Sequence, residues 1–247
     1  MKFPTLRTKK EPVPERKDEY AQCRVMSDLL DPNGDAVQSW RIFRIMSEFV
    51  SGFEILRKYG LAVTFFGSAR RHAGDDVYQD AEDLAAKLAK AGFAIITGGG
   101  PGVMEAANVG AFKVGGHSVG LNIELPMEQS LNPYTTDTEK FHFFFIRKVM
   151  LSFAAEVYVY FPGGFGTMDE LFEIITLVQT KKITPVPIIL YGKEYWTPLL
   201  SWIEETMYKK YKMIDKEDMD IFHLVDSVEE AYEYIVKKTN FCTPKQV

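Results

Sequence analysis

One carboxylate of the chain, Glu170, lies at the end of a segment that is typical of phosphate-binding turns. The segment 162–170 (PGGFGTMDE) follows an apolar run at 156–161 and precedes a helical pattern. Closely spaced glycines let backbone N–H groups turn toward a ligand, and a helix N-terminus attracts anions. A phosphate-binding turn beside a carboxylate predicts chemistry on a phosphorylated small molecule.

This interpretation assigns a role to most residues of the segment. We expect the backbone of Gly163, Gly164 and Gly166, with Thr167 at the start of the helix, to contact the phosphate. Glu170 has a structural alternative, because Thr167 as N-cap and Glu170 three residues later fit a capping box. If Glu170 faces the ligand, its place near a helix N-terminus predicts an ionised carboxylate, which suits stabilising a positive charge or orienting water.

A second glycine turn follows the apolar run at 93–96. Gly98, Gly99 and Gly100 lie between this run and a helical pattern that begins at 102. We expect these glycines to contact the ribose and the phosphate, although a tight strand-to-helix turn could by itself require glycine.

Two polar residues occupy similar positions. Ser68 follows the apolar run at 62–66, and Glu105 lies in the first turn of the helix after Gly100. Loops at the carboxyl ends of parallel strands form the ligand crevice of open α/β sheets. We expect Ser68 to bind substrate or to stabilise its turn, and Glu105 to hold a ribose hydroxyl or a loop.

Arg147 and Lys148 follow a long segment, 124–140, and an aromatic run at 142–145. Long loops in compact domains are usually functional or disordered. We expect Arg147 near the start of a helix, beside the crevice. Arginine does not readily give up its proton, so we assign it to orienting Glu170 or the ligand. Lys148 is expected to bind substrate or to pair with a neighbouring carboxylate.

Apolar strands and amphipathic helices alternate from residue 61 onward, which predicts an α/β fold with a mostly parallel sheet covered on both faces. We expect an N-terminal tail and amphipathic helix at 1–59 and a nucleotide-binding catalytic domain at 60–240. The expected strands are 61–66, 93–97, 118–123, 142–145, 155–161 and 185–190. The expected helices are 36–59, 76–91, 102–113, 146–153, 167–181, 194–210 and 227–238.

Composition argues against several functional classes. The net charge of −5 gives no broad basic field, so we expect no nucleic-acid partner. Cys23 and Cys242 lack metal-ligand spacing and are expected to be free thiols in a reducing compartment. No apolar run reaches the roughly 18 residues of a membrane span, which favours a cytoplasmic protein without membrane contact.

Three segments of the chain resemble the signatures of the LONELY GUY (LOG) family of cytokinin-activating nucleoside 5′-monophosphate phosphoribohydrolases, long labelled possible lysine decarboxylases. They are 98–105 (GGGPGVME), the pair Arg147 and Lys148, and 162–170 (PGGFGTMDE). The similarity covers about residues 60–190. It implies a Rossmann-like three-layer α/β/α fold, a homodimer or larger homo-oligomer, and no metal or cofactor.

The resemblance also implies a reaction: hydrolysis of the N-glycosidic bond of a nucleoside 5′-monophosphate, such as AMP or a cytokinin riboside monophosphate. The family's catalytic arginine and glutamate correspond to Arg147 and Glu170, and Asp169 stands where relatives often have Glu. The alternative function is a non-catalytic protein that binds or senses a nucleotide. A decarboxylase would need a lysine that carries pyridoxal phosphate, and no lysine has a persuasive setting.

Overall fold

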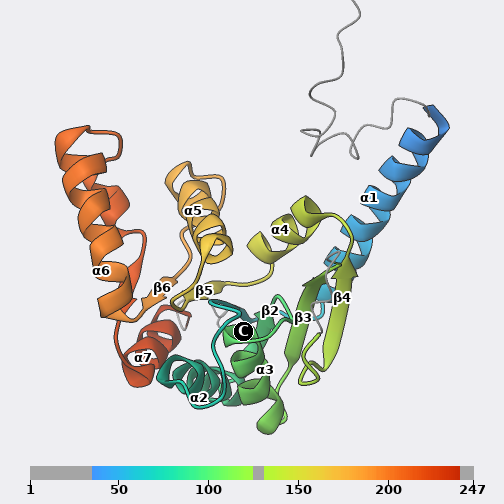
Figure 1. The fold of residues 1–247 in the computed structure, drawn as a ribbon, viewed down its shortest axis with the longest axis horizontal. Helices are drawn as coiled ribbons and strands as arrows, with labels where there is room; N and C mark the ends of the chain where they lie inside the picture. The colour runs from blue at the N-terminus through green and yellow to red at the C-terminus, as the bar shows by residue number, and fades with distance from the viewer. Residues whose placement is uncertain (1–34, 125–130, 240–247) are drawn as a thin grey trace, which may run out of the picture. The chain divides into compact units, whose positions relative to one another are not determined.

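The structure is a computed structural model that describes residues 35–124 and 131–239 (Figure 1). The chain divides into two units between Arg44 and Ile45, inside the helix α1 (Asp35–Leu56). The described part of the first unit is the beginning of α1, where Trp40 and Phe43 contact each other. All other elements belong to the second unit.

A seven-stranded parallel sheet forms the centre of the second unit. Its strands are β1 (Ala62–Phe66), β2 (Ala94–Thr97), β3 (Ser118–Ile123), β4 (Asp137–Phe141), β5 (Val157–Tyr160), β6 (Ile188–Tyr191) and β7 (His223–Val225). They lie side by side in the order β4-β3-β2-β1-β5-β6-β7, and every neighbouring pair is parallel.

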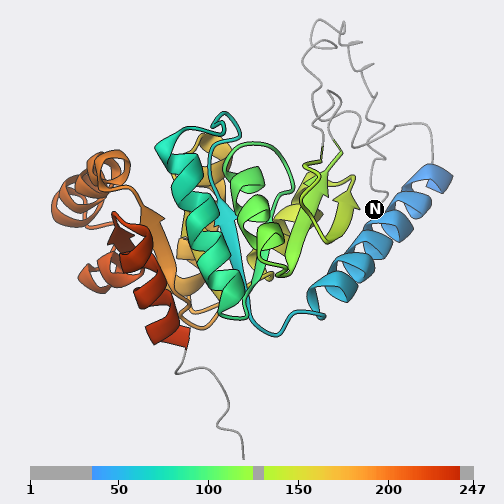
Figure 2. The ribbon, with the colours of Figure 1, turned by 90° about the horizontal axis from the view of Figure 1, so that it is seen from below.

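Helices cover both faces of the sheet, which confirms the predicted Rossmann-like three-layer fold (Figures 1 and 2). One layer contains α2 (Asp76–Lys90), α3 (Val103–Lys113) and α7 (Val228–Thr239). The other contains α4 (Phe144–Ser152), α5 (Phe165–Gln179) and α6 (Lys193–Trp202), which continues as a π-helical segment, Ile203–Lys210. A short 3₁₀ helix, Lys216–Asp220, precedes β7.

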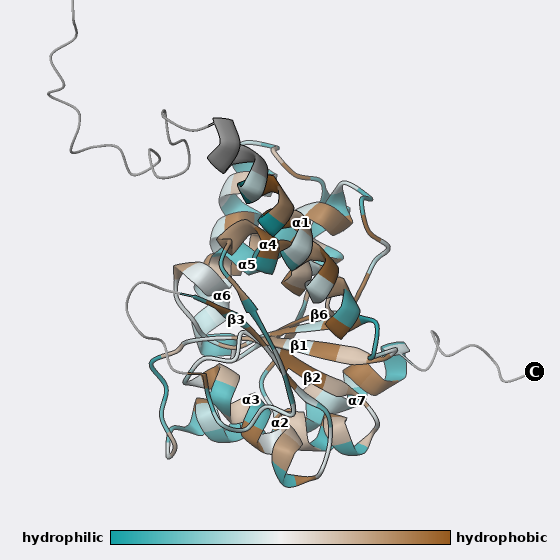
Figure 3. Ribbon diagram, turned by 90° about the vertical axis from the view of Figure 1, so that its right-hand side faces the viewer, coloured by the Kyte–Doolittle hydropathy of each residue, from teal (hydrophilic) through white to brown (hydrophobic). Residues whose placement is uncertain are grey.

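The two layers are separated by the alternation of side chains along the strands. Val63 and Phe65 of β1 pack into the core under α2 and α3, whereas Ala62 and Phe66 pack into the core under α4, α5 and α6. Figure 3 shows the apolar strands between the two helix layers. Because both faces are buried, the strands read as continuous apolar runs, which is why their positions could be predicted.

One predicted strand, at an edge of the sheet, was wrong. The aromatic run 142–145, predicted as a strand, leads into α4 and supplies its first two residues, and the strand is the preceding segment β4. Glu48 Oε2 accepts the backbone N–H groups of His142 and Phe143 at 3.1 and 3.2 Å, so a carboxylate stabilises this helix N-terminus. The short strand β7 was not predicted.

The strand order reverses direction between β1 and β5, since chain connections run outward from β1 on one side and outward from β5 on the other. Ligands of open α/β sheets bind outside the carboxyl ends of the strands at such a point. Among the described residues, no helix is long and apolar enough to cross a membrane.

Candidate functional site

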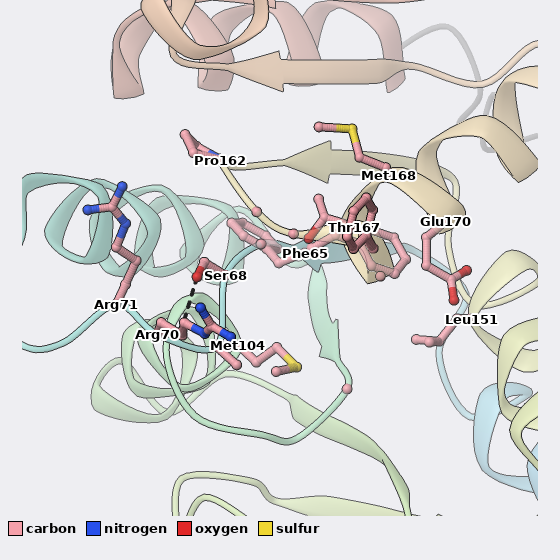
Figure 4. Close-up of a pocket in the computed structure, with 18 of the residues that line it drawn as sticks. Phe65, Ser68, Arg70, Arg71, Met104, Leu151, Pro162, Thr167, Met168 and Glu170 are labelled. Carbon is pink, nitrogen blue, oxygen red and sulfur yellow. Dashed lines mark hydrogen bonds between the residues drawn. The ribbon is translucent and has the colours of Figure 1, made fainter.

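An open cavity of about 940 Å³ lies at the carboxyl ends of β1 and β5 (Figure 4). The turns after these two strands, together with α4, α5 and the start of α6, supply most of its wall. The predicted site residues that line it are Ser68, Gly98, Arg147, Gly163, Gly164, Gly166, Thr167 and Glu170. The predicted site residues that lie outside this lining are Gly99, Gly100, Glu105 and Lys148.

The helix after the PGGFGT turn begins earlier than predicted. Gly164 is the N-cap with an extended backbone (φ −93°, ψ −158°), so α5 starts at Phe165 and Thr167 already lies within the first turn. The predicted capping box of Thr167 and Glu170 is therefore wrong, and within the described chain no side chain caps this end. The first N–H groups of the helix lack intrahelical acceptors and can bind an anion.

The glycines of this turn divide into two kinds. Gly163 packs against the side chain of Thr167 so closely that a Cβ atom would overlap it, whereas Gly164 and Gly166 border open space. The Tyr195 hydroxyl, from the start of α6, donates a 2.5 Å hydrogen bond to the Gly163 carbonyl. Since C=O and N–H of a trans peptide point in opposite directions, this bond turns the Gly164 N–H away from Tyr195.

Glu170 is a buried carboxyl group on the cavity wall. The residue is 8% exposed, and its Oε2 has no hydrogen-bond partner among the described residues. Burial raises the pKa of Glu170 to about 7, although the cations Lys148 and Arg147 oppose the shift. The expectation that this carboxylate stays ionised is therefore wrong. The loss of hydration raises its pKa by more than the helix N-terminus lowers it, so Glu170 can exchange a proton near neutral pH.

Arg147 faces the same cavity from the neighbouring helix, α4. Its Nε donates a 2.8 Å hydrogen bond to the Leu121 carbonyl of β3, which fixes the guanidinium over the end of the sheet. Burial lowers the pKa of Arg147, and the charge of Glu170 acts in the opposite direction. The two side chains thus form an electrostatically coupled pair of a cation and a titratable carboxyl.

Lys148, the neighbour of Arg147, points to α5 instead of the cavity. Its Nζ lies 2.5 Å from Asp169 Oδ2 and 2.9 Å from Glu173 Oε2. These ion pairs connect α4 to α5, the two helices that carry Arg147 and Glu170. The contacts favour the pairing role over the substrate-binding role for Lys148.

The second glycine turn is supported by a buried polar network. The Thr97 hydroxyl accepts the Gly99 N–H at 2.9 Å, and the Asn132 side chain donates to the Gly100 carbonyl at 3.1 Å. Asn132 also donates to Asn108 Oδ1 at 2.9 Å. Gly99 has φ +69°, a conformation that favours glycine. Gly99 and Gly100 therefore shape the turn, while Gly98 forms part of the cavity wall.

The remaining two predicted residues have different surroundings. The Ser68 hydroxyl lines the cavity and accepts the Arg70 backbone N–H at 3.1 Å, so it both borders the site and stabilises its turn. Glu105 contacts the Tyr78 hydroxyl at 3.5 Å, between α3 and α2. Its position favours a role in holding α2 rather than in contacting a ligand.

The cavity wall contains residues that the sequence analysis did not assign to a site. They are Phe65, Phe66, Arg70, Arg71, Met104, Phe144, Leu151, Pro162, Phe165, Met168 and Tyr195, with the small residues Gly67 and Ala69. The charged residues of the lining are three arginines and one glutamate, which fits an anionic ligand. Among the described residues, no group of three or more His, Cys, Asp or Glu side chains could hold a metal ion.

Sequence comparison finds relatives that carry an enzyme name. The chain is 28% identical over 200 residues to the Arabidopsis thaliana cytokinin riboside 5′-monophosphate phosphoribohydrolase LOG1, covering 78% of this chain and 88% of that protein. It is also 28% identical over 146 residues to the cytokinin riboside 5′-monophosphate phosphoribohydrolase of Rhodococcoides fascians, covering 58% of this chain and 74% of the relative.

Solved structures share the fold. The X-ray structure of TM1055 has a TM-score of 0.56 and 28% identity, over 72% of this chain and 99% of that chain. The molybdenum cofactor binding protein of Rippkaea orientalis has a TM-score of 0.54 at 20% identity, over 72% of this chain and 95% of that chain, and shows the fold alone.

The model of one protein family, described as "possible lysine decarboxylase", matches residues 104–235, more than half of the chain. This range includes Arg147, Glu170 and the PGGFGT turn. The family match, the named relatives and the shared fold lead to one conclusion: the chain belongs to the LOG family.

Proposed function

We propose that the protein hydrolyses the N-glycosidic bond of nucleoside 5′-monophosphates and releases the free base and ribose 5-phosphate. The observation that carries the proposal is the buried carboxyl of Glu170, a residue of the cavity lining. Its Oε2 has no hydrogen-bond partner among the described residues, and burial raises its pKa to about 7. Relatives at 28% identity are named for this reaction on cytokinin riboside 5′-monophosphates.

The phosphate binds at the N-terminal end of α5 in this proposal. Gly164 and Gly166 border open space there, and the first N–H groups of the helix can donate to phosphate oxygens. Binding the phosphate at this end leaves the ribose between the turn and Glu170, which lies farther along the same helix.

Glu170 acts on the anomeric carbon. As the bond between C1′ and the base breaks, positive charge develops on the ribose, and a carboxylate held in place beside it stabilises that charge. With a pKa of about 7, Glu170 also accepts a proton from the water that attacks C1′. The hydroxide joins C1′, and the proton is passed on to the departing base.

Arg147 orients this reaction rather than donating a proton, since a guanidinium remains charged. Its hydrogen bond to Leu121 holds it rigidly, and its charge favours the ionised form of Glu170. A rigid cation beside the carboxylate positions Glu170 and donates hydrogen bonds to the ribose or to acceptor atoms of the base.

The alternative is a protein that binds a nucleotide without cleaving it. Purified protein incubated with AMP distinguishes the two, because cleavage yields adenine and ribose 5-phosphate whereas a binder returns intact AMP. A parallel incubation with a cytokinin riboside monophosphate compares the two base types. Intact nucleotide in every incubation, with demonstrable binding, would replace the enzyme proposal by the binding one.

We also propose a homo-oligomer of at least two chains. In the second unit, α1 carries the large apolar side chains Met46 and Val50, both more than half exposed. In the first unit, Trp40, Ile42 and Phe43 are also more than half exposed. Exposed apolar side chains of this kind are typical of subunit interfaces. Light scattering at micromolar concentration should give at least twice the mass of the 247-residue chain. A monomer under those conditions would contradict the proposal.

A further inference from the structure

The turn after β1 places a second arginine, Arg70, on the cavity wall. The Arg70 guanidinium has no ion-pair partner among the described residues, whereas the adjacent Arg71 lies 3.9 Å from Asp75. Figure 4 shows the two side chains diverging from the turn. Arg70 is thus an unpaired cation at the edge of a cavity, a position where an anionic ligand supplies the missing partner.

Hydrogen bonds hold the Arg70 turn against the turn that precedes α5. The Ser68 N–H donates to the Pro162 carbonyl at 3.0 Å, and the Val103 N–H donates to the Ser68 carbonyl at 3.0 Å. The Ser68 hydroxyl accepts the Arg70 N–H and so fixes the backbone from which the side chain extends. Arg70 therefore lies only two residues after Ser68, which bonds directly to the PGGFGT segment.

A phosphate bound at the N-terminal end of α5 needs a further positive charge to balance its own negative charge. A phosphate monoester carries about −1.5 to −2 charges at neutral pH, whereas a helix N-terminus offers roughly half a positive charge. Arg147 is coupled to Glu170, and Lys148 is paired with Asp169 and Glu173. Of the lining arginines, Arg70 is the one that the described residues leave without a carboxylate.

We infer that Arg70 neutralises the 5′-phosphate of the bound nucleotide, and that it thereby sets the preference of the site for nucleotides over nucleosides. The inference rests on the proposed function for the identity of the ligand. The planar guanidinium donates two parallel hydrogen bonds to phosphate oxygens that the α5 N–H groups leave unsatisfied.

The test measures binding rather than turnover. Calorimetry gives the Kd of AMP and of adenosine for the Glu170→Gln protein, which we expect not to cleave AMP during the measurement, and for the same protein carrying Arg70→Ala, Arg70→Lys or Arg71→Ala. Arg70→Ala should weaken AMP binding roughly tenfold to a hundredfold, the range for a hydrogen bond to a charged group. Adenosine binding should change less than about twofold in all variants.

Arg71→Ala is the matched control, because it removes an adjacent arginine of the same cavity wall that already has a carboxylate neighbour. It should change the Kd of AMP less than about twofold, and Arg70→Lys should recover part of the lost affinity. Equal effects of Arg70→Ala and Arg71→Ala, or an Arg70→Lys protein as weak as Arg70→Ala, would overturn the inference.

The binding test separates this inference from the proposed function. If the wild-type protein releases adenine while Arg70→Ala keeps its affinity for AMP, the function stands and the role of Arg70 is wrong. If Arg70→Ala loses affinity for AMP but the wild-type protein releases no adenine, Arg70 remains the phosphate cation of a nucleotide-binding protein.

Discussion

Gly98 lies directly against the guanidinium of Arg147, so that a Cβ atom built on Gly98 would overlap Nη2. The contact joins the glycine turn after β2 to the helix α4, and Arg147 is held on its other side by the Leu121 carbonyl. Because Gly98 has no side chain, it leaves the space that the Arg147 guanidinium occupies on the cavity wall. This explains why glycine is needed at a position with no positive φ.

Gly98→Ala should displace Arg147 and reduce kcat/KM for AMP roughly tenfold to a hundredfold, the cost of misplacing a positioned group. The overlapping atom is the far end of a flexible side chain, so the fold should survive. The free energy of unfolding should fall by about 1 kcal/mol, the value of one hydrogen bond. Gly60→Ala, at a glycine that borders open space, serves as control. Equal kcat/KM values for the two variants would contradict this account of Gly98.

The pH dependence of kcat/KM should report Glu170. Its pKa of about 7 means that the carboxylate, the form that stabilises the ribosyl cation and accepts the water proton, increases as pH rises through 7. We expect kcat/KM to rise about tenfold per pH unit below pH 7 and to level off above it. In Glu170→Gln the residual activity should lack this rise. A wild-type profile that is flat between pH 5 and 8 would show that Glu170 does not titrate in the working enzyme.

The free energy of unfolding should also depend on the protonation of Glu170. Here the protonated form is the favourable one, whereas activity needs the ionised form. The pKa of Glu170 is raised from 4.5 to about 7, so the folded state favours the protonated form. Below pH 4.5 Glu170 is protonated in both the folded and the unfolded state, so it does not reduce the free energy of unfolding. Between pH 4.5 and 7 it ionises in the unfolded state but stays protonated in the folded state, so the free energy of unfolding falls as pH rises. Glu170→Gln removes this cost and should stabilise the protein by up to about 3 kcal/mol at pH 8.

At pH 5 most of that gain should disappear, because wild-type Glu170 is then protonated in the folded state. Urea unfolding at pH 5 and pH 8 measures the difference. Glu233→Gln is the control, since Glu233 is an exposed carboxylate on α7, in the opposite helix layer. A gain from Glu170→Gln that is equal at both pH values would contradict the raised pKa.

The buried strands and the glycine turns could be predicted from the sequence, and the fold prediction is confirmed. Parallel strands covered on both faces are continuously apolar, and the turns after β1, β2 and β5 begin where such runs end. The edge strand β4 (DTEKF) escaped prediction because it is half-solvated and carries charged residues. The neighbouring aromatic run, 142–145, was therefore predicted as the strand instead.

The site could be predicted where its residues lie close in sequence to a glycine turn. Glu170, Thr167 and Arg147 belong to recognisable motifs, and the structure brings them to one cavity. The bond from Tyr195 to Gly163 crosses 32 residues, and no sequence pattern marks it. The raised pKa of Glu170 also escaped prediction, because a motif does not reveal how deeply a carboxyl is buried.

The most direct test of the central claim, that Glu170 carries the bond cleavage, is the rate of adenine release from AMP by Glu170→Gln, measured together with its melting temperature and compared with Glu233→Gln. Gln keeps the shape of the side chain and removes its charge. We predict a fall in turnover of roughly a hundredfold or more for Glu170→Gln, in a folded protein, and near-normal turnover for Glu233→Gln, a change at an exposed position on α7. Near-normal turnover by a folded Glu170→Gln protein would contradict the account.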